Sequence, residues 1–211
     1  MKTTTLLRAG FALALALPAA AFAASVPQAF TATYNVLQGG SPLGTATIQL
    51  KPAGNGQFEY TNQSKGTAGI AAMLGASVSE TSRFSWAGNV PQLVSYRYDM
   101  QAIKPKTREV TVQGATVQVQ DNEKNYSYAS VPGMVDRNTL PLALGVALGA
   151  GQKDVTLPVA VKQAVENQQF RAAANEQVKV EAGTFNAVRV DRVDEKRGFT
   201  ACMFRRSTRC P

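Results

Sequence analysis

Aromatic residues recur in pairs two positions apart, and these pairs are the residues of the chain best suited to recognising a ligand. The pairs are Phe58/Tyr60, Phe84/Trp86, Tyr96/Tyr98 and Tyr126/Tyr128. Residues i and i+2 of a β-strand point to the same face of the sheet, so the rings of these pairs are expected to share one surface. Such rings either pack as core between a sheet and a helix, or line an apolar cavity in which Tyr hydroxyls and the Trp N–H orient a ligand. The candidate ligand-binding residues are Phe58, Tyr60, Phe84, Trp86, Tyr96 and Tyr98.

The residue types that activate nucleophiles and bind transition metals are scarce. The chain contains no His, which excludes a Ser-His-Asp triad, a Cys-His pair and a His-ligated zinc site. Both cysteines, Cys202 and Cys210, lie near the C-terminus, so thiol catalysis and thiolate metal sites are excluded for the body of the chain. The carboxylates are scattered singly, and no spacing indicates a glycosidase pair. The sequence therefore predicts a protein that is not an enzyme and has no catalytic residue, cofactor or metal.

Two further segments have compositions that suit contact with a lipid. Gly69 to Gly75 is apolar and contains Met73, and it is expected to form either one helical turn or a loop. It would serve as a plug closing one end of a barrel, as a lid, or as a lipid-touching loop. Lys104, Lys106 and Arg108 place three cations within five residues, which is typical of a solvated turn or a protected edge strand, or of a phosphate or head-group contact.

Strands must position these residues, because apolar and polar residues alternate through most of the chain. The first strand carries Phe30, Ala32, Tyr34 and Val36 on one side. Its return strand, at 46–50, follows a turn at 39–42. Further strands are predicted at 58–60, 81–86, 93–102, 108–112, 117–119, 126–128, 177–181 and 187–193. This pattern predicts an all-β fold, an antiparallel curled sheet or incomplete β-barrel with one packed α-helix.

The single helix is predicted between Asp136 and Gly149, where Leu140 and Leu144 recur at helical spacing. Asn138 is its expected N-cap. Pro141 lies in the first turn, where its missing N–H costs little. This helix is expected to pack on the sheet.

The first 23 residues have the pattern of a secretory signal peptide. Lys2 and Arg8 make the start positive, the apolar run from Ala9 to Phe22 is too short to span a bilayer, and a small-residue motif ends at Ala23. We predict cleavage after Ala23 and a periplasmic location. No later run is long and apolar enough to predict a membrane-spanning segment.

We divide the sequence into three regions: a signal peptide at 1–23, a single antiparallel β domain at 24–200, and a tail at 201–211. The net charge falls from +8 to +6 when Lys2 and Arg8 are removed, and three tail arginines carry half of the remainder. Because the body is only weakly basic, nucleic acid is not expected as a partner. The charge is compatible with a weak peripheral attraction to anionic lipid head groups.

The tail departs from the strand pattern, because both cysteines and three arginines crowd into residues 202–211. Inserting one base in codon 202 gives, with permitted third bases, Trp-Tyr-Val-Pro-Ala-Lys-Tyr-Pro-Val-Pro, an aromatic strand followed by a Pro-bounded turn. We hypothesise that one base has been lost there and that residues 201–211 are out of frame. The alternative is a genuine tail in which Cys202 and Cys210 form a disulfide worth about 2–3 kcal/mol.

Segments 30–36, 44–47 and 178–190 together resemble a bacterial family of secreted proteins, domain of unknown function 3108 (DUF3108). Members open with an aromatic-rich strand, a turn and a Gly-x-Ala-x return strand, which matches Gly44-Thr45-Ala46-Thr47. A Gly-Thr-Phe turn joins two late strands in the family, as Gly183-Thr184-Phe185 does here. The resemblance implies an envelope location and an all-β fold, and it supplies no activity.

Two functions follow from these observations. The leading interpretation is a periplasmic binding or carrier module for an apolar or amphiphilic, lipid-like ligand. The alternative is an interaction protein of envelope assembly that uses an exposed strand edge or the apolar loop at 69–75.

Overall fold

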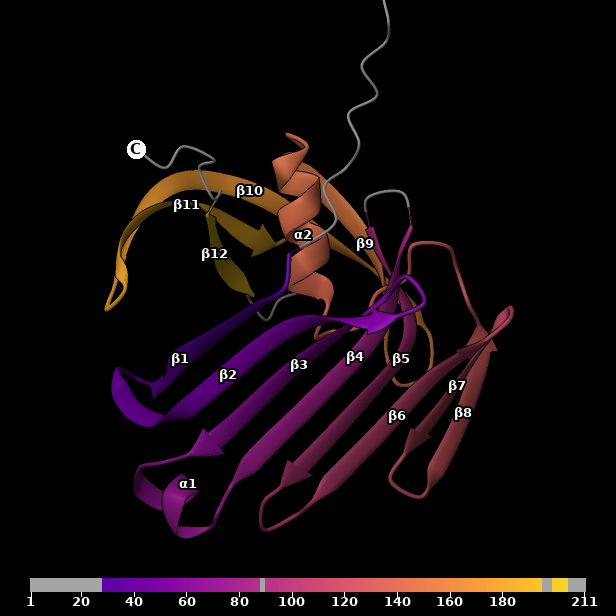
Figure 1. Ribbon diagram of the computed structural model, residues 1–211, viewed down its shortest axis with the longest axis horizontal. Helices are drawn as coiled ribbons and strands as arrows, with labels where there is room; N and C mark the ends of the chain where they lie inside the picture. Colours follow the sequence, from indigo (N-terminus) through magenta and orange to yellow (C-terminus); the bar gives the residue numbers. More distant parts are fainter. Residues whose placement is uncertain (1–27, 88–89, 195–198, 205–211) are drawn as a thin grey trace, which may run out of the picture.

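The computed structural model describes residues 28–87, 90–194 and 199–204, and they form two antiparallel sheets and two helices (Figure 1). The first sheet has eight strands, each hydrogen-bonded to the next in chain order. Its strands are β1 (Phe30–Gln38), β2 (Ser41–Gly54), β3 (Gln57–Gly66), β4 (Ser77–Ala87), β5 (Val90–Gln101), β6 (Lys106–Gln113), β7 (Thr116–Asp121) and β8 (Lys124–Ala129). Consecutive connections therefore alternate between the two ends of this sheet.

The second sheet has four strands in the order β12-β11-β10-β9. They are β9 (Asp154–Ala160), β10 (Val165–Val180), β11 (Gly183–Arg192) and β12 (Thr200–Phe204). In the described residues the two hydrogen-bonded ladders stay separate, and an isolated parallel bridge pairs Val135 with Val159. The architecture is thus the antiparallel, incompletely closed barrel that the alternation predicts.

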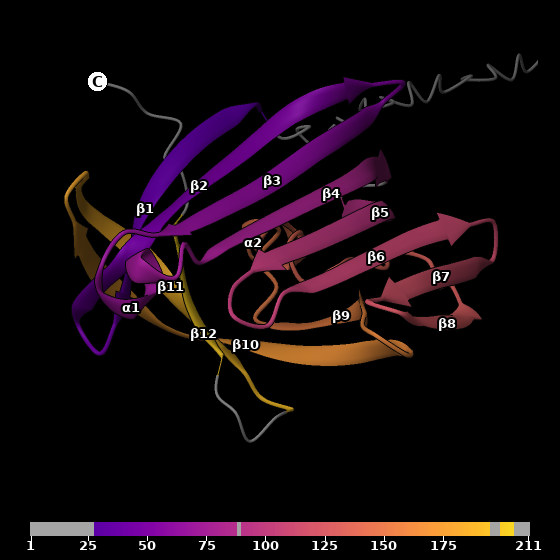
Figure 2. The ribbon, with the colours of Figure 1, turned by 90° about the horizontal axis from the view of Figure 1, so that it is seen from below.

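Helix α2 (Leu140–Gly149) lies between the two sheets (Figures 1 and 2). Its residues are apolar on every side, which is expected of a helix that is covered on more than one face. Leu140 and Leu144 pack with Phe170 and Val190 of the second sheet, whereas Leu142 packs on the first. The predicted packing of one helix on the sheet is confirmed.

Helix α1 (Gly69–Met73) is a single turn between β3 and β4, one of the two conformations expected there. It has no buried residue. Gly66 lies so close beneath it that a Cβ on Gly66 would be 2.7 Å from the backbone of Ala71. In the described residues, no helix is both long and apolar enough to cross a membrane.

The predicted N-cap of the long helix was wrong. The helix begins at Leu140, inside the predicted segment, with Thr139 at the N-cap position. The Asn138 side chain donates to the Tyr60 carbonyl oxygen and to Ser82 Oγ, at 3.1 Å each, instead of capping. The Asp136 carboxylate instead accepts the backbone N–H groups of Asn138 and Thr139. Asn138 therefore ties the start of α2 to the first sheet.

The sequence analysis also missed β9 and the first half of β10. Pro158 argues against a strand at β9, because proline cannot donate a backbone hydrogen bond within a sheet. Its carbonyl nevertheless accepts a hydrogen bond from the Val135 N–H, and its neighbours pair with β10. In β10 the first buried, inward-facing residue is Gln168, and the next is Phe170. The alternation of apolar and polar residues is therefore not visible in the sequence before Phe170.

The tail begins as a strand, which the loss of alternation did not predict. Thr200–Phe204 pairs with β11, and Met203 packs against the cluster around α2. Cys202 is exposed and forms no disulfide with another described residue. Cys210 lies outside the described residues, so the disulfide and the reading-frame hypothesis stay predictions.

Candidate functional site

The face of the first sheet that meets α2 carries rows of side chains that cross the strands, because Cα partners of an antiparallel ladder point to the same face. One row is buried and mostly apolar: Leu50, Tyr60, Ser82, Tyr96, Val110 and Val119. The next row toward α1 is mostly polar: Ile48, Asn62, Glu80, Tyr98, Arg108 and Asp121. A polar band therefore runs across the inside of the sheet beside the apolar core.

Three of the predicted ligand-binding aromatics pack against one another at the end of the sheet away from α1. The ring centroids of Phe58 and Phe84 are 5.6 Å apart and stacked, and Trp86 lies 6.5 Å from Phe58 and 6.4 Å from Phe84. Leu142 of α2 packs against this group. The Trp86 indole N–H is buried and meets no acceptor in the described part of the chain. These rings follow the core alternative of the sequence analysis.

The three predicted tyrosines have separate environments. Tyr60 is buried with Phe84, and burial raises its pKa to about 12. Tyr96 belongs to a second cluster, and burial together with Glu80 raises its pKa as well. The ring of Tyr98 lies 5.4 Å from the guanidinium carbon of Arg137. The six predicted residues therefore share the inner face of the first sheet but divide between two hydrophobic clusters.

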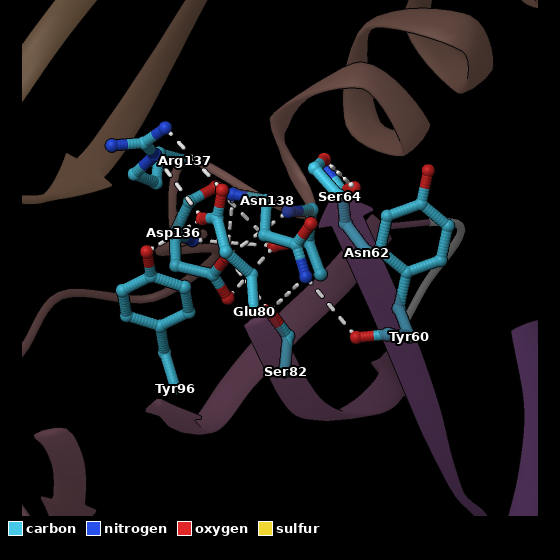
Figure 3. A network of polar contacts seen from close by, with 10 residues as sticks. Tyr60, Asn62, Ser64, Glu80, Ser82, Tyr96, Asp136, Arg137 and Asn138 are labelled. Carbon is cyan, nitrogen blue, oxygen red and sulfur yellow. Dashed lines mark hydrogen bonds and ion pairs between the residues drawn. The ribbon is translucent and has the colours of Figure 1, made fainter. Parts of the chain in front are cut away.

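The Asp136 carboxylate, fully buried at the start of α2, is the centre of a polar network (Figure 3). Its Oδ1 accepts hydrogen bonds from Ser82 Oγ at 2.9 Å, from the Asn138 N–H at 2.8 Å and from the Thr139 N–H at 3.0 Å. Its Oδ2 accepts one from Thr139 Oγ1 at 3.0 Å. Burial outweighs these bonds and raises the pKa of Asp136 to about 6.

Glu80 joins the polar band to the loop before α2. The Tyr96 hydroxyl donates to Glu80 Oε2 at 2.6 Å. Arg137 Nη2 donates to Glu80 Oε1 at 3.3 Å, and Arg137 Nε lies 3.2 Å from Oε2 as an ion pair. Glu80 is almost fully buried, whereas the Arg137 side chain is 62% exposed. The guanidinium is thus held in place by one carboxylate while it still reaches solvent.

A second ion cluster surrounds Asp121 at the far end of the polar band. Arg108 Nε lies 2.8 Å from Oδ1, and Lys162 Nζ lies 2.7 Å from Oδ2. Burial acts to raise the pKa of Asp121, but the hydrogen bonds from Lys162 and Arg108 hold it below its usual range. The Lys162 ammonium also lies 5.2 Å from the ring centre of Tyr126.

Between the two sheets lies a cavity of about 370 Å³, called here the central cavity. Its apolar walls are Val110, Leu140, Val159, Ala160, Val161, Phe170 and Phe199. Its polar lining consists of Tyr96, Gln168, Arg108, Arg137 and Arg192, and no carboxylate lines it among the described residues. Of the six predicted ligand-binding residues, Tyr96 alone lines this cavity.

A second hollow, called here the α1 groove, has a volume of about 270 Å³ and an almost wholly apolar surface. It lies at the end of the first sheet, beyond the polar band. Ala71 and Ala76 flank it, and Val36, Val78 and Met100 contribute side chains from the strands. Among the described residues, no group of three or more His, Cys, Asp or Glu side chains is placed to hold a metal ion.

Sequence reasoning missed the arginines of the central cavity. Arg108 was noted as part of a cationic turn, whereas Arg137 has no motif around it. Arg192 belongs to a stretch of alternating charges, 191–197, whose pattern is typical of a solvated strand end or hairpin loop. Their convergence depends on how the second sheet folds back over the first. The one available signal was Asp136-Arg137 directly before an apolar helix.

The comparisons with known proteins identify a family. The sequence matches the family described as "Protein of unknown function (DUF3108)" over residues 29–209. Among solved structures, the chain is similar to a beta-barrel-like protein of domain of unknown function DUF1849 from Brucella abortus, with 9% identity, a TM-score of 0.47 and 76% of each chain covered. No curated protein matches the sequence. Since the family match extends from β1 past β12, it confirms the resemblance carried by the first and last strand pairs, and the chain belongs to the DUF3108 family.

Proposed function

We propose that the protein is a non-enzymatic binding module of the bacterial periplasm for a single-chain anionic amphiphile, such as a fatty acid, held in the central cavity. The observation that carries the proposal is the lining of this cavity, in which apolar walls meet three arginines and no described carboxylate. A volume of about 370 Å³ lies in the range of small-molecule sites.

The walls of the cavity suit an apolar chain. Val110, Val159 and Phe170 are buried residues from both sheets, so a chain between them is removed from water. Each methylene group buried in this way contributes about 0.8 kcal/mol. The walls therefore provide affinity for the chain but little selectivity for its head group.

The arginines provide that selectivity. Arg137 is anchored to Glu80 and reaches solvent, and Arg108 is anchored to Asp121. A guanidinium has five N–H donors, so one carboxylate partner leaves donors for a second acidic group. A carboxylate or phosphate head group is the chemical class that this arrangement favours.

We propose no catalytic role for Asp136. A buried carboxyl with a raised pKa is the kind of group that serves as an acid or base in enzymes. Here four donors surround it, it has no exposed surface, and it does not line the central cavity. Its contacts support a role in fixing α2 to β4.

The test measures binding of dansyl-labelled undecanoic acid through the fluorescence of the dansyl group. Dodecanoate or dodecanol is then added to displace this probe. We expect dodecanoate to compete better than dodecanol, and Arg137→Gln to weaken dodecanoate binding about tenfold because it removes a charged hydrogen bond. Dodecanol binding should change little. The N-terminus of the protein used, determined by mass spectrometry, tests cleavage after Ala23.

The matched control is Arg97→Gln. Arg97 is 58% exposed, pairs with Glu109, and does not line the central cavity. The substitution therefore removes the same charge from a similarly exposed site, and the binding of both ligands should not change. Failure of the protein to bind either ligand, or equal losses in the two variants, would contradict the proposal.

A further inference from the structure

The end of the first sheet that carries α1 presents a group of exposed apolar side chains. Leu37, Ile70, Met73, Leu74 and Ile103 are between 45% and 86% exposed. Leu37 lies at the end of β1 beside the β1–β2 turn, and the other four lie in the β3–β4 connection with α1 and in the β5–β6 connection. In a meander these connections fall at the same end of the sheet, and Figure 1 shows them along its lower side. We call these five residues the apolar tips.

The apolar tips are held in place by backbone contacts. The Gly66 N–H donates to the Ala76 carbonyl at 2.8 Å, and the Ala76 N–H donates to the Ala71 carbonyl at 2.9 Å, which closes the α1 loop on itself. Since α1 has no buried residue, its apolar side chains add nothing to the described core. This end of the molecule thus displays hydrophobic groups that folding does not explain.

Lysines accompany the apolar tips. Lys65 lies near the end of β3, just before α1, and Lys104 lies in the β5–β6 connection. Lys106 and Lys124 begin β6 and β8 at the same end of the sheet. Glu123 lies in the β7–β8 connection at this end, and Asp121 beside it is buried and already paired with Arg108 and Lys162. The Glu181 carboxylate accepts a hydrogen bond from Asn35 of β1 at 3.1 Å. Cationic side chains around apolar ones complement an anionic membrane surface, where apolar groups enter the acyl boundary and lysines meet the head groups.

We propose that this end of the protein docks on an anionic lipid bilayer, with Ile70 and Met73 of α1 entering the interface and Lys104 meeting the head groups. The α1 groove lies directly behind the tips and is also apolar, so the docking surface extends inward instead of ending at a polar wall. Docking of this kind is peripheral. It rests on different residues from those of the central cavity, and either proposal can fail without the other.

The test is co-sedimentation with vesicles of phosphatidylcholine alone and of phosphatidylcholine with one third phosphatidylglycerol. We expect binding to the anionic vesicles, weakened at least tenfold by the double variant Ile70→Ser/Met73→Ser and about fivefold by Lys104→Gln. Every protein compared must have the same N-terminus by mass spectrometry, because the apolar run at 9–22 would itself bind lipid if it were retained.

Two controls remove equivalent groups from the opposite end of the sheet. Val131→Ser changes an exposed apolar residue after β8, and Lys51→Gln removes a lysine near the β2–β3 turn. Neither is expected to alter binding. Equal binding to neutral and anionic vesicles, no binding to either, or the same loss in test and control variants would overturn the proposal.

A second readout guards against misfolded variants. Met73→Trp places an indole at the most exposed apolar tip, and its emission should shift to shorter wavelength when anionic vesicles are added. Val131→Trp should show no such shift. Unfolding curves without lipid should match those of the unaltered protein, since Ile70 and Met73 are 73% and 86% exposed.

Discussion

At the scale of single residues, Asp136 shows how burial and hydrogen bonding compete. Four donors stabilise its charged form, yet the absence of any exposed surface raises its pKa from 3.8 to about 6. The folded protein therefore binds this proton more tightly than the unfolded chain does. The contribution of Asp136 to stability is fully present below about pH 4 and is lost as the pH rises through 6.

The variant Asp136→Asn tests this sign. Asparagine has nearly the same shape, can accept the same backbone N–H groups through its carbonyl, and does not titrate. The unfolding free energy of the native protein minus that of the variant should fall by about 2 kcal/mol between pH 4 and pH 7, in denaturant titrations. Glu59, Asp121 and Asp194, whose pKa values are lowered, act in the opposite direction but cancel in this difference. A difference that is constant with pH would contradict the assignment.

At the scale of elements, α1 depends on one glycine. A Cβ on Gly66 would lie 2.7 Å from the carbonyl carbon and Cβ of Ala71, and backbone atoms cannot move aside as a flexible side chain does. We expect Gly66→Ala to lower the free energy of unfolding by about 1–3 kcal/mol, as overpacking does elsewhere, and to weaken vesicle docking by displacing α1.

Gly149→Ala is the control for that substitution. Gly149 is the last residue of α2, and no heavy atom lies within 4 Å of an added Cβ. Alanine is favoured over glycine in helices, so this variant should be neutral or slightly stabilising. If chemical denaturation gives the two variants the same stability, the close approach of α1 to β3 is not a constraint on the fold.

The elements that the sequence predicted and those that it missed differ in a physical way. The first sheet is buried on one face, so alternation from Phe30 to Tyr128 located its strands, although β5 starts at Val90 rather than Leu93. Strand β9 contains Pro158. In β10 residues 166–169 are all polar, and one of them, Gln168, occupies a buried position. Alternation cannot find a strand whose inward residue is polar.

The candidate site was less accessible to sequence reasoning. The two residues of an aromatic pair do lie on one face of the sheet. The bulge between Arg83 and Phe84 and the width of the sheet nevertheless divide the pairs between two hydrophobic clusters. The central cavity draws Tyr96, Arg137 and Phe170 from three elements, and their proximity depends on the second sheet folding back over the first. No local pattern encodes that arrangement.

At the scale of the whole molecule, the central cavity lies between the two sheets, with α2 beside it. Its walls belong to the first sheet through Val110, to α2 through Leu140 and to the second sheet through Phe170. Few backbone hydrogen bonds join these parts, since the ladders of the two sheets stay separate in the described residues. A ligand in the cavity would add contacts that all three elements share.

Such a ligand should therefore stabilise the fold as a unit. Dodecanoate at about one hundred times its dissociation constant, and below its micellar concentration, should raise the free energy of unfolding by about 2.7 kcal/mol without changing the denaturant slope. At the same concentration, Arg137→Gln, with tenfold weaker binding, should gain about 1.4 kcal/mol. Equal gains in the two proteins would show that the fatty acid stabilises them without contacting Arg137. A gain accompanied by a changed slope would mean that it acts on the unfolded chain, because ligand held in the cavity leaves the surface exposed on unfolding nearly the same.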